Sequence, residues 1–239
     1  PDTQCIFQNV QKVLPGHVTT LALASSTATS EAYETFSDLL EQGIEKRGAM
    51  IKGDLDKLEA TLGQVVGEQM LSDVPLGCFL SGGVDSSLIA ALMQSRSSRP
   101  IQTFAIGFSE ARFNEAPHAA AVARHLCTDH TEFILSEQDA LGVITDLPDI
   151  YDEPFADSSQ IPTVLLCREA RKAVTVALTG DGGDEVFGGY NRHVVGPQLL
   201  SKLQSVPRGL RSSAGRFISA CAPLITSENG WLRRFALRA

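Results

Sequence analysis

The chain has 239 residues, 43% of them hydrophobic, which is enough for one large or two small domains with an ordinary core. Its 20 Lys and Arg against 28 Asp and Glu give a net charge of −8, which argues against nonspecific binding to nucleic acid or to an anionic membrane. No segment approaches the roughly 18 consecutive apolar residues that span a bilayer. Five cysteines without a C-x-x-C pair favour a reduced, cytoplasmic chain over a disulfide or zinc framework.

The first quarter of the chain is weakly patterned. Residues 1–24 predict two strands around the turn at Pro15-Gly16. Residues 24–31 show no apolar periodicity and the helical signal weakens again over residues 47–53, so we expect a linker over residues 25–53. From Asp54, an expected N-cap, apolar residues recur at helical spacing as far as Met70. Residues 54–239 are therefore predicted to be the main domain.

Strand and helix patterns alternate through this domain. We expect strands at residues 76–80, 101–108, 130–135 and 173–178, and helices from residue 88 and at residues 115–126, 137–150 and 161–172. Such alternation predicts an α/β fold with a doubly wound parallel sheet and helices on both faces. Ligands of these folds bind at the carboxyl ends of the strands.

A glycine-rich turn follows the strand predicted at residues 76–80. It consists of Ser81-Gly82-Gly83-Val84-Asp85-Ser86-Ser87 and leads into the next helical pattern. Glycines and small hydroxyl residues at such a turn let backbone N–H groups approach an anion. The turn lacks the Lys of a Walker A loop, and Asp85 repels phosphate unless Mg²⁺ bridges the two. We expect a phosphate cradle with its own metal ligand; the alternative is an ordinary glycine turn.

Two further stretches contain candidate functional carboxylates. Gly180-Asp181-Gly182-Gly183-Asp184-Glu185 follows the last predicted strand, so the two glycine-rich turns share one edge of the sheet. Its carboxylates suit a shared metal, although a solvated loop is the alternative. Tyr151-Asp152-Glu153-Pro154-Phe155-Ala156-Asp157-Ser158-Ser159 lies between the turns. It suits a catalytic acid or base, and its last three residues equally suit a helix N-cap.

Together these motifs resemble a known family. Residues 79–87 are similar to the PP-loop of N-type ATP pyrophosphatases. With residues 103–108, 114–116, 151–159 and 179–190, they resemble the synthetase domain of glutamine-hydrolysing asparagine synthetases, over about residues 55–193. Residues 4–23 are similar to the last strands of the glutaminase domain that precedes it in this family. The resemblance implies an adenine nucleotide alpha hydrolase-like fold preceded by a short β remnant.

The resemblance also implies an AMP-forming reaction in which ATP adenylates the side-chain carboxylate of aspartate and releases pyrophosphate. Ammonia from glutamine then displaces AMP to give asparagine, and we expect a cytoplasmic homodimer. Leu80 and Ile106 would flank the adenosine. The implied site residues are Leu80, Ser81, Gly82, Gly83, Asp85, Ser86, Ser87, Ile106, Gly180 and Gly182 for ATP and pyrophosphate, Glu153 and Asp181 for catalysis, and Asp85 and Asp184 for Mg²⁺.

Three features depart from the family pattern. The glutaminase nucleophile of the family is an N-terminal Cys, whereas this chain begins with Pro1, and Cys5 is expected to be structural. The Lys that stabilises the activated intermediate is expected beyond Ala239, and Cys127 stands where the pattern favours Gly. We therefore expect a fragment: a glutaminase remnant over 1–24, a linker over 25–53 and a truncated synthetase domain over 54–239.

Three alternatives stay open at this point. A relative could amidate another acid, such as a cell-surface sugar or a β-lactam precursor. The isolated chain could bind nucleotide without catalysis. A PP-loop enzyme that modifies tRNA is the third alternative, and the net charge of −8 disfavours it.

Overall fold

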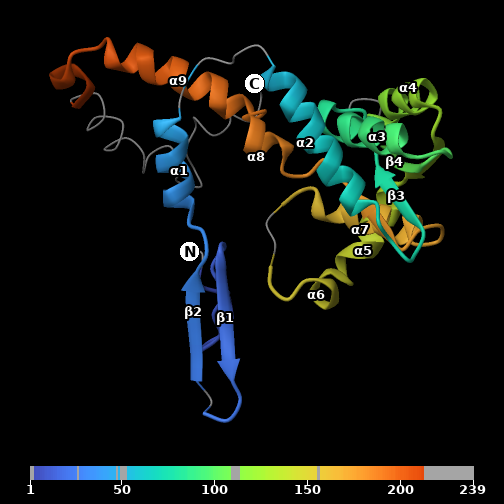
Figure 1. Ribbon diagram of the computed structural model, residues 1–239, viewed down its shortest axis with the longest axis horizontal. Helices are drawn as coiled ribbons and strands as arrows, with labels where there is room; N and C mark the ends of the chain where they lie inside the picture. The colour runs from blue at the N-terminus through green and yellow to red at the C-terminus, as the bar shows by residue number, and fades with distance from the viewer. Residues whose placement is uncertain are drawn as a thin grey trace, which may run out of the picture. The chain divides into compact units, whose positions relative to one another are not determined.

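The computed structural model describes residues 3–25, 27–46, 48, 53–108, 114–154 and 157–212, and the chain divides into two compact units, residues 1–180 and 181–239 (Figure 1). The elements of the first unit are β1 (His17–Ala22), β2 (Thr27–Ala32), α1 (Phe36–Glu45), α2 (Asp54–Gln69), β3 (Leu76–Phe79), α3 (Val84–Arg96), β4 (Gln102–Phe108), α4 (Ala116–Leu126), β5 (Asp129–Leu135), α5 (Glu137–Ile144), α6 (Leu147–Ile150), α7 (Gln160–Ala170) and β6 (Val176–Leu178). The second unit contains α8 (Gly183–Phe187) and α9 (Asn191–Gln204).

Strands β3 to β6 form one parallel sheet in the order β5-β4-β3-β6. From β3 the chain moves outward through β4 to β5, and it then returns to place β6 on the other side of β3. The strand order therefore reverses between β3 and β6. In open α/β sheets, ligands bind at such a reversal, beyond the carboxyl ends of the strands.

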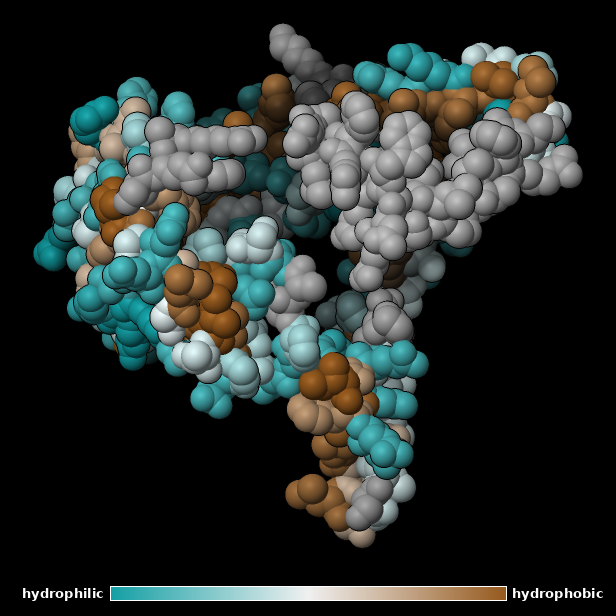
Figure 2. All heavy atoms as spheres, turned by 180° about the vertical axis from the view of Figure 1, so that it is seen from behind, coloured by the Kyte–Doolittle hydropathy of each residue, from teal (hydrophilic) through white to brown (hydrophobic). Residues whose placement is uncertain are grey.

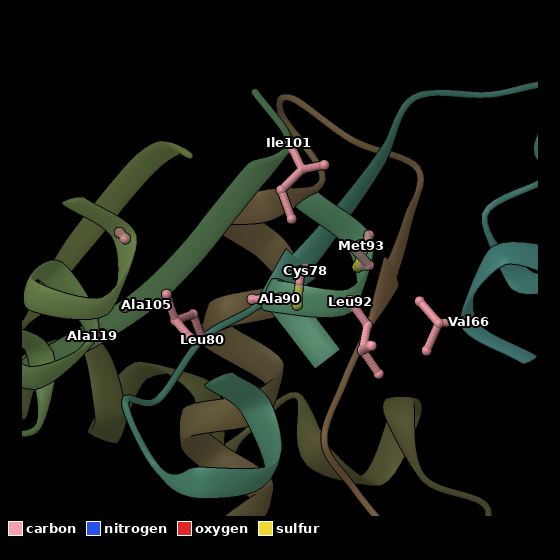
Figure 3. Packing of buried hydrophobic residues seen from close by; sticks show 10 residues of the cluster. Val66, Cys78, Leu80, Ala90, Leu92, Met93, Ile101, Ala105 and Ala119 are labelled. Carbon is pink, nitrogen blue, oxygen red and sulfur yellow. The ribbon is translucent and has the colours of Figure 1, made fainter. Parts of the chain in front are cut away.

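Helices cover both faces of this sheet. On one face, side chains of α2, α3 and α4 pack against β3 and β4 in a cluster made of Val66, Cys78, Leu80, Ala90, Leu92, Met93, Ile101, Ala105, Ala119 and Ala123 (Figure 3). On the other face, α5 and α7 contribute to two clusters made of Leu135, Val143, Val164 and Leu165, and of Phe104, Ala170 and Val174. The predicted parallel α/β fold with helices on both faces is confirmed.

Two details of the predicted helices are wrong. The helix predicted over residues 137–150 is two helices, because α5 ends at Ile144 and α6 begins at Leu147. Pro148 has no N–H to donate, so it suits the first turn of a new helix rather than a helix interior. Asp54 is the first residue of α2 rather than its N-cap, which is Gly53 in the left-handed conformation.

The N-terminal strands also differ from the prediction. No hairpin forms around Pro15-Gly16; instead β1 follows that turn and pairs antiparallel with β2, which lies in the predicted linker. Residues 4–11 form a loop closed by an isolated bridge between Gln4 and Gln11. Most side chains of the hairpin are exposed, and the hydrophobic ones show as brown spheres at the bottom of Figure 2. A strand exposed on both faces has no apolar alternation, so its sequence resembles a linker.

The predicted linker also contains a helix. The Thr35 side chain accepts a hydrogen bond from the Asp38 N–H, and the Asp38 carboxylate accepts one from the Thr35 N–H. This capping box satisfies two backbone donors at the start of α1. Phe36, Leu39, Leu40 and Ile44 recur at helical spacing, so the sequence carries an amphipathic signal for α1 that the linker prediction overlooked, although no residue of this helix is buried.

The cysteines in the described residues are free thiols, and Cys221 lies outside those residues. Cys127 is the C-cap of α4 and adopts the left-handed conformation, with φ 57°. Glycine is the preferred residue at helix ends of this conformation, which explains why the family pattern favours Gly here. No helix of the described part is long and apolar enough to cross a membrane.

Replacing Phe104 tests the core between β4 and α7. Phe104 is 2% exposed, so Phe104→Ala is expected to lower the free energy of unfolding by about 3–5 kcal/mol through lost burial and an unfilled cavity. Urea denaturation measures this change. The matched control is Leu71→Ala at a side chain that is 84% exposed, where the change should stay within about 0.5 kcal/mol.

A second prediction concerns His130 on β5. Its Nδ1 lies 2.9 Å from Thr103 Oγ1, its Nε2 is buried without a partner among the described residues, and burial lowers its pKa below the ordinary 6.5. The unfolded chain binds this proton more readily than the folded chain does. The contribution of neutral His130 to the free energy of unfolding is therefore fully present above pH 6.5 and is lost as the pH drops toward the lower pKa of the folded state. His130→Gln should flatten that slope in urea titrations, whereas His125→Gln, at an exposed position of α4, should not.

Candidate functional site

The two glycine-rich turns of the sequence lie at the carboxyl ends of β3 and β6, the neighbouring strands between which the strand order reverses. The first turn leads from β3 into α3, and the second begins directly after β6. The parallel pairing of Cys78 with Leu178 places the ends of both strands at one edge of the sheet. The fold therefore brings the start of the second turn to the first turn.

Gly180 shows how closely the two turns approach. A Cβ at this position would lie 2.6 Å from the Ser86 backbone nitrogen and 2.8 Å from the Asp85 carbonyl carbon. Both neighbours are backbone atoms of the first turn of α3, which cannot move aside as a flexible side chain can. Gly180 is therefore required by the close approach of the chain after β6 to the start of α3.

Hydrogen bonds within the first turn fix its shape. Ser86 Oγ accepts from the Ser81 N–H at 3.1 Å and lies 2.9 Å from Ser81 Oγ. Ser81 Oγ in turn accepts from the Gly83 N–H at 3.2 Å. The Ser86 hydroxyl is buried and holds the two ends of the turn together, so its observed partners lie within the protein.

Ser87 differs from its neighbour. Its Oγ is buried and has no hydrogen-bond partner among the described residues. Leaving a buried hydroxyl unpaired is unfavourable unless a ligand or water satisfies it. The hydroxyl lies in the first turn of α3, where helix geometry leaves backbone N–H groups without intrahelical acceptors. This turn therefore offers donors that suit a phosphate group.

The start of α4 borders the same turn. Gly82 is left-handed, with φ 81°, and a Cβ there would lie 2.6 Å from Ala119 N and 2.7 Å from His118 Cβ. Asn114 lies just before α4, and its Oδ1 accepts a hydrogen bond at 3.1 Å from the N–H of Ala116, the first residue of that helix. Neither His118 nor Asn114 is among the predicted site residues. The signal that could have identified them is their position just after β4, at the same edge of the sheet.

The two residues expected to flank adenosine belong to different core clusters. Leu80 is 1% exposed and packs with Ala105 on the face covered by α3 and α4 (Figure 3). Ile106 is half-buried and packs with Val164 and Leu165 on the opposite face. Their side chains are thus part of the packed interior, and contact with an adenosine stays a prediction.

The predicted Mg²⁺ ligands are divided between the two units. Asp85 lies in the first turn of α3, and Asp184 lies in α8 of the second unit. Within the described part of the chain, no group of three or more His, Cys, Asp and Glu side chains could hold a metal ion. A magnesium ion commonly has one or two carboxylate ligands and completes its shell with phosphates and water. Asp85 fits that pattern, and a shared ion with Asp184 stays a prediction.

The second turn is well fixed within its own unit. Gly182 is the N-cap of α8, and the Gly189 N–H donates to the Asp184 carbonyl oxygen at 3.1 Å. Tyr190 Oη donates to the Glu185 carboxylate, which raises the pKa of the tyrosine and lowers that of Glu185. The Arg192 guanidinium lies 4.2 Å from the centre of the Tyr190 ring. The predicted roles of Asp181 and Gly182 are not tested by this arrangement.

Two carboxylates of the 151–159 stretch have clear partners. Asp157 accepts hydrogen bonds from the Ser159 hydroxyl at 2.7 Å and from its N–H at 2.8 Å, and these bonds lower the pKa of Asp157. This local turn precedes α7, as the N-cap interpretation expected, although the cap residue Ser159 makes no side-chain cap bond. Glu153 pairs with Lys12 and accepts from the Ile6 N–H at 3.2 Å. The hydrogen bond from Lys12 is the main cause that lowers the pKa of Glu153.

Comparison with known proteins adds an independent finding. The family model described as asparagine synthase matches residues 57–233. A Methanocaldococcus jannaschii relative is 43% identical over 144 residues, which cover 60% of this chain and 28% of that protein. The glutamine-hydrolyzing asparagine synthetase 1 of Bacillus subtilis is 37% identical over 147 residues, or 61% of this chain and 23% of that protein. The chain thus spans about a quarter of the length of these relatives.

Solved structures give weaker similarities. A glutamine-dependent NAD+ synthetase from Acinetobacter baumannii, in complex with ADP, has a TM-score of 0.43 and 19% identity. The match covers 62% of this chain and 30% of that one. An NH3-dependent NAD synthetase from Campylobacter jejuni has a TM-score of 0.42 and 15% identity, over 58% of this chain and 61% of that one.

The two adjacent serines of α3 give opposite predictions. Ser86→Ala removes the acceptor of the Ser81 N–H, so it should lower the free energy of unfolding by about 1 kcal/mol. Ser87→Ala removes an unpaired buried hydroxyl and should leave stability unchanged or slightly raised. Urea denaturation without nucleotide measures both. Equal losses in the two variants would contradict the assignment of different roles.

Proposed function

Because the chain belongs to the asparagine synthase family, we propose that it binds ATP and takes part in ATP-dependent, AMP-forming amide synthesis. In this reaction a carboxylate oxygen of aspartate attacks the α-phosphorus of ATP, and pyrophosphate leaves. Ammonia then attacks the activated carbonyl carbon, loses a proton, and AMP leaves to give asparagine. The names of the relatives suggest glutamine as the source of the ammonia.

The observation that carries this proposal is the position of the first turn. It lies at the reversal of strand order, it contains a buried hydroxyl at Ser87 that has no partner among the described residues, and Gly180 lets the chain after β6 approach its backbone closely. Phosphate binding supplies acceptors for that hydroxyl and for the first N–H groups of α3. A loop without a Walker lysine suits a leaving pyrophosphate better than transfer of a γ-phosphate.

Each residue of the turn has a distinct proposed role. Ser81, Ser86 and the Gly83 N–H hold the turn in shape, while the Ser87 hydroxyl and the Gly82 backbone would contact the pyrophosphate. Asp85 would hold Mg²⁺, which on binding neutralises charge on the phosphate oxygens as pyrophosphate departs. Preorganised donors of this kind stabilise charge in the transition state at little reorganisation cost.

The remaining assignments are proposals from the family resemblance. Leu80 and Ile106 would flank adenosine, Glu153 and Asp181 would act in catalysis, and Gly182 would lie near ATP. Asp184 would be a second carboxylate for Mg²⁺. A cytoplasmic homodimer is proposed on the same ground.

ATP–pyrophosphate exchange tests the proposal. With aspartate and Mg²⁺ present, the chain should move labelled pyrophosphate into ATP, and Asp85→Asn should slow this by about 100-fold or more through loss of the metal ligand. Asp56→Asn is the matched control, since Asp56 is likewise an acidic residue in the first turn of a helix.

The choice of acid determines how the outcome is interpreted. If exchange occurs with another acid but not with aspartate, that acid is the acceptor and the aspartate assignment is wrong. Binding of Mg·ATP without exchange for any acid would contradict the proposed ligase activity. In either case, Ser87→Ala should weaken ATP or pyrophosphate binding by about tenfold if its hydroxyl contacts phosphate.

A further inference from the structure

The N-terminal loop of residues 3–12 contacts Glu153 through two different donors. The Ile6 backbone N–H donates to Glu153 Oε2 at 3.2 Å, and Lys12 Nζ forms an ion pair with Glu153 Oε1. The side chain of Glu153 is 26% exposed, so it is partly buried. Each of its two oxygens has a donor from a segment more than a hundred positions away in the chain.

The loop is built to present both donors from one side. The Lys12 N–H donates to the Thr3 carbonyl oxygen at 3.0 Å, and Gln4 and Gln11 form a bridge, so the two ends of the loop lie together. Inside it, Cys5 Sγ donates to the Val10 carbonyl oxygen at 3.4 Å. Closure at its base holds the Ile6 N–H and the Lys12 ammonium near the same carboxylate.

We propose that residues 3–12 are an N-terminal latch whose docking point is Glu153, and that Lys12 is a positioning residue for this carboxylate. The latch fixes the segment that carries Glu153, which lies between α6 and α7. Docking therefore couples the N-terminal segment to a loop of the α/β core. Its consequence for catalysis rests on the proposed function, in which Glu153 is the predicted acid or base.

The charges around Glu153 give the latch a measurable effect. Lys12 is the charged group of the latch that faces Glu153. The Cys5 side chain faces Lys12 and makes a minor contribution that raises the pKa of this lysine. The hydrogen bond from Lys12 lowers the pKa of Glu153, followed by a smaller contribution from the Ile6 N–H. The latched carboxylate therefore stays ionised to lower pH than a free one.

Carboxyl ¹³C NMR of the whole chain tests the proposal without any nucleotide. The titration midpoint of Glu153 should rise in Lys12→Met and stay near that of the wild type in Lys12→Arg, which keeps the charge. The matched control is Lys172→Met, which removes a lysine from the surface ion pair with Glu169 and should leave Glu153 unaffected. Disappearance of the signal in Glu153→Gln assigns it.

Hydrogen exchange at the Ile6 amide provides a second readout. Exchange should be about threefold to tenfold faster in Glu153→Ala, which removes the acceptor of the Ile6 N–H, and in Lys12→Met than in Lys172→Met. The same Glu153 midpoint in Lys12→Met and wild type, or unchanged Ile6 exchange in Glu153→Ala, would overturn the latch. Neither of these two measurements involves ATP. Failure of the ATP–pyrophosphate exchange assay would therefore contradict the proposed function and leave the latch intact.

Discussion

The structure depends on a steric constraint at one edge of the sheet: the backbone after β6 lies against the first turn of α3 with no room for a side chain between them. Gly180 meets this constraint, because a Cβ there would overlap backbone atoms of Asp85 and Ser86. The approach brings together two turns that are about a hundred residues apart in sequence. In open α/β sheets, ligands bind at this edge, where the strand order reverses.

In the first turn, the two neighbouring serines Ser86 and Ser87 have different environments. Ser86 gives its hydroxyl to the interior of the turn, whereas the neighbouring hydroxyl of Ser87 is buried and unpaired among the described residues. Holding an unsatisfied group ready for a ligand costs stability in the free protein, and functional sites commonly carry such a cost. Rigid internal bonds next to unpaired donors are what a preorganised anion site requires.

The core could be predicted from sequence because its elements bury a continuous or periodic set of apolar residues. Residues 101–108 are one example, and Leu62, Val66 and Met70 of the helix predicted from residue 54 are another; both predicted elements are present. β2 gave no such signal, since all of its residues are exposed. The apolar stripe of α1 is present in the sequence, but none of its residues is buried, so the stripe alone does not reveal where this helix packs.

The candidate site was predictable in residue type and location, but not in the partner of each side chain. The sequence places Ser81 to Ser87 after a strand, yet it cannot tell which hydroxyl faces inward. The partner of Glu153 lies in the N-terminal loop, far outside any local motif, so only the folded chain reveals it. His118, which lies beside Gly82 of the turn, was missed because its place depends on where β4 ends.

The left-handed C-cap at Cys127 has a practical consequence for work with this protein. A residue with a Cβ is disfavoured at φ 57° by about 1 kcal/mol or more, and this one also places an exposed thiol on the surface. Replacing that cysteine with glycine would relieve the backbone and remove a site of air oxidation in one step. The end of α4 thus offers protein engineering a position where shelf life and folding stability improve together.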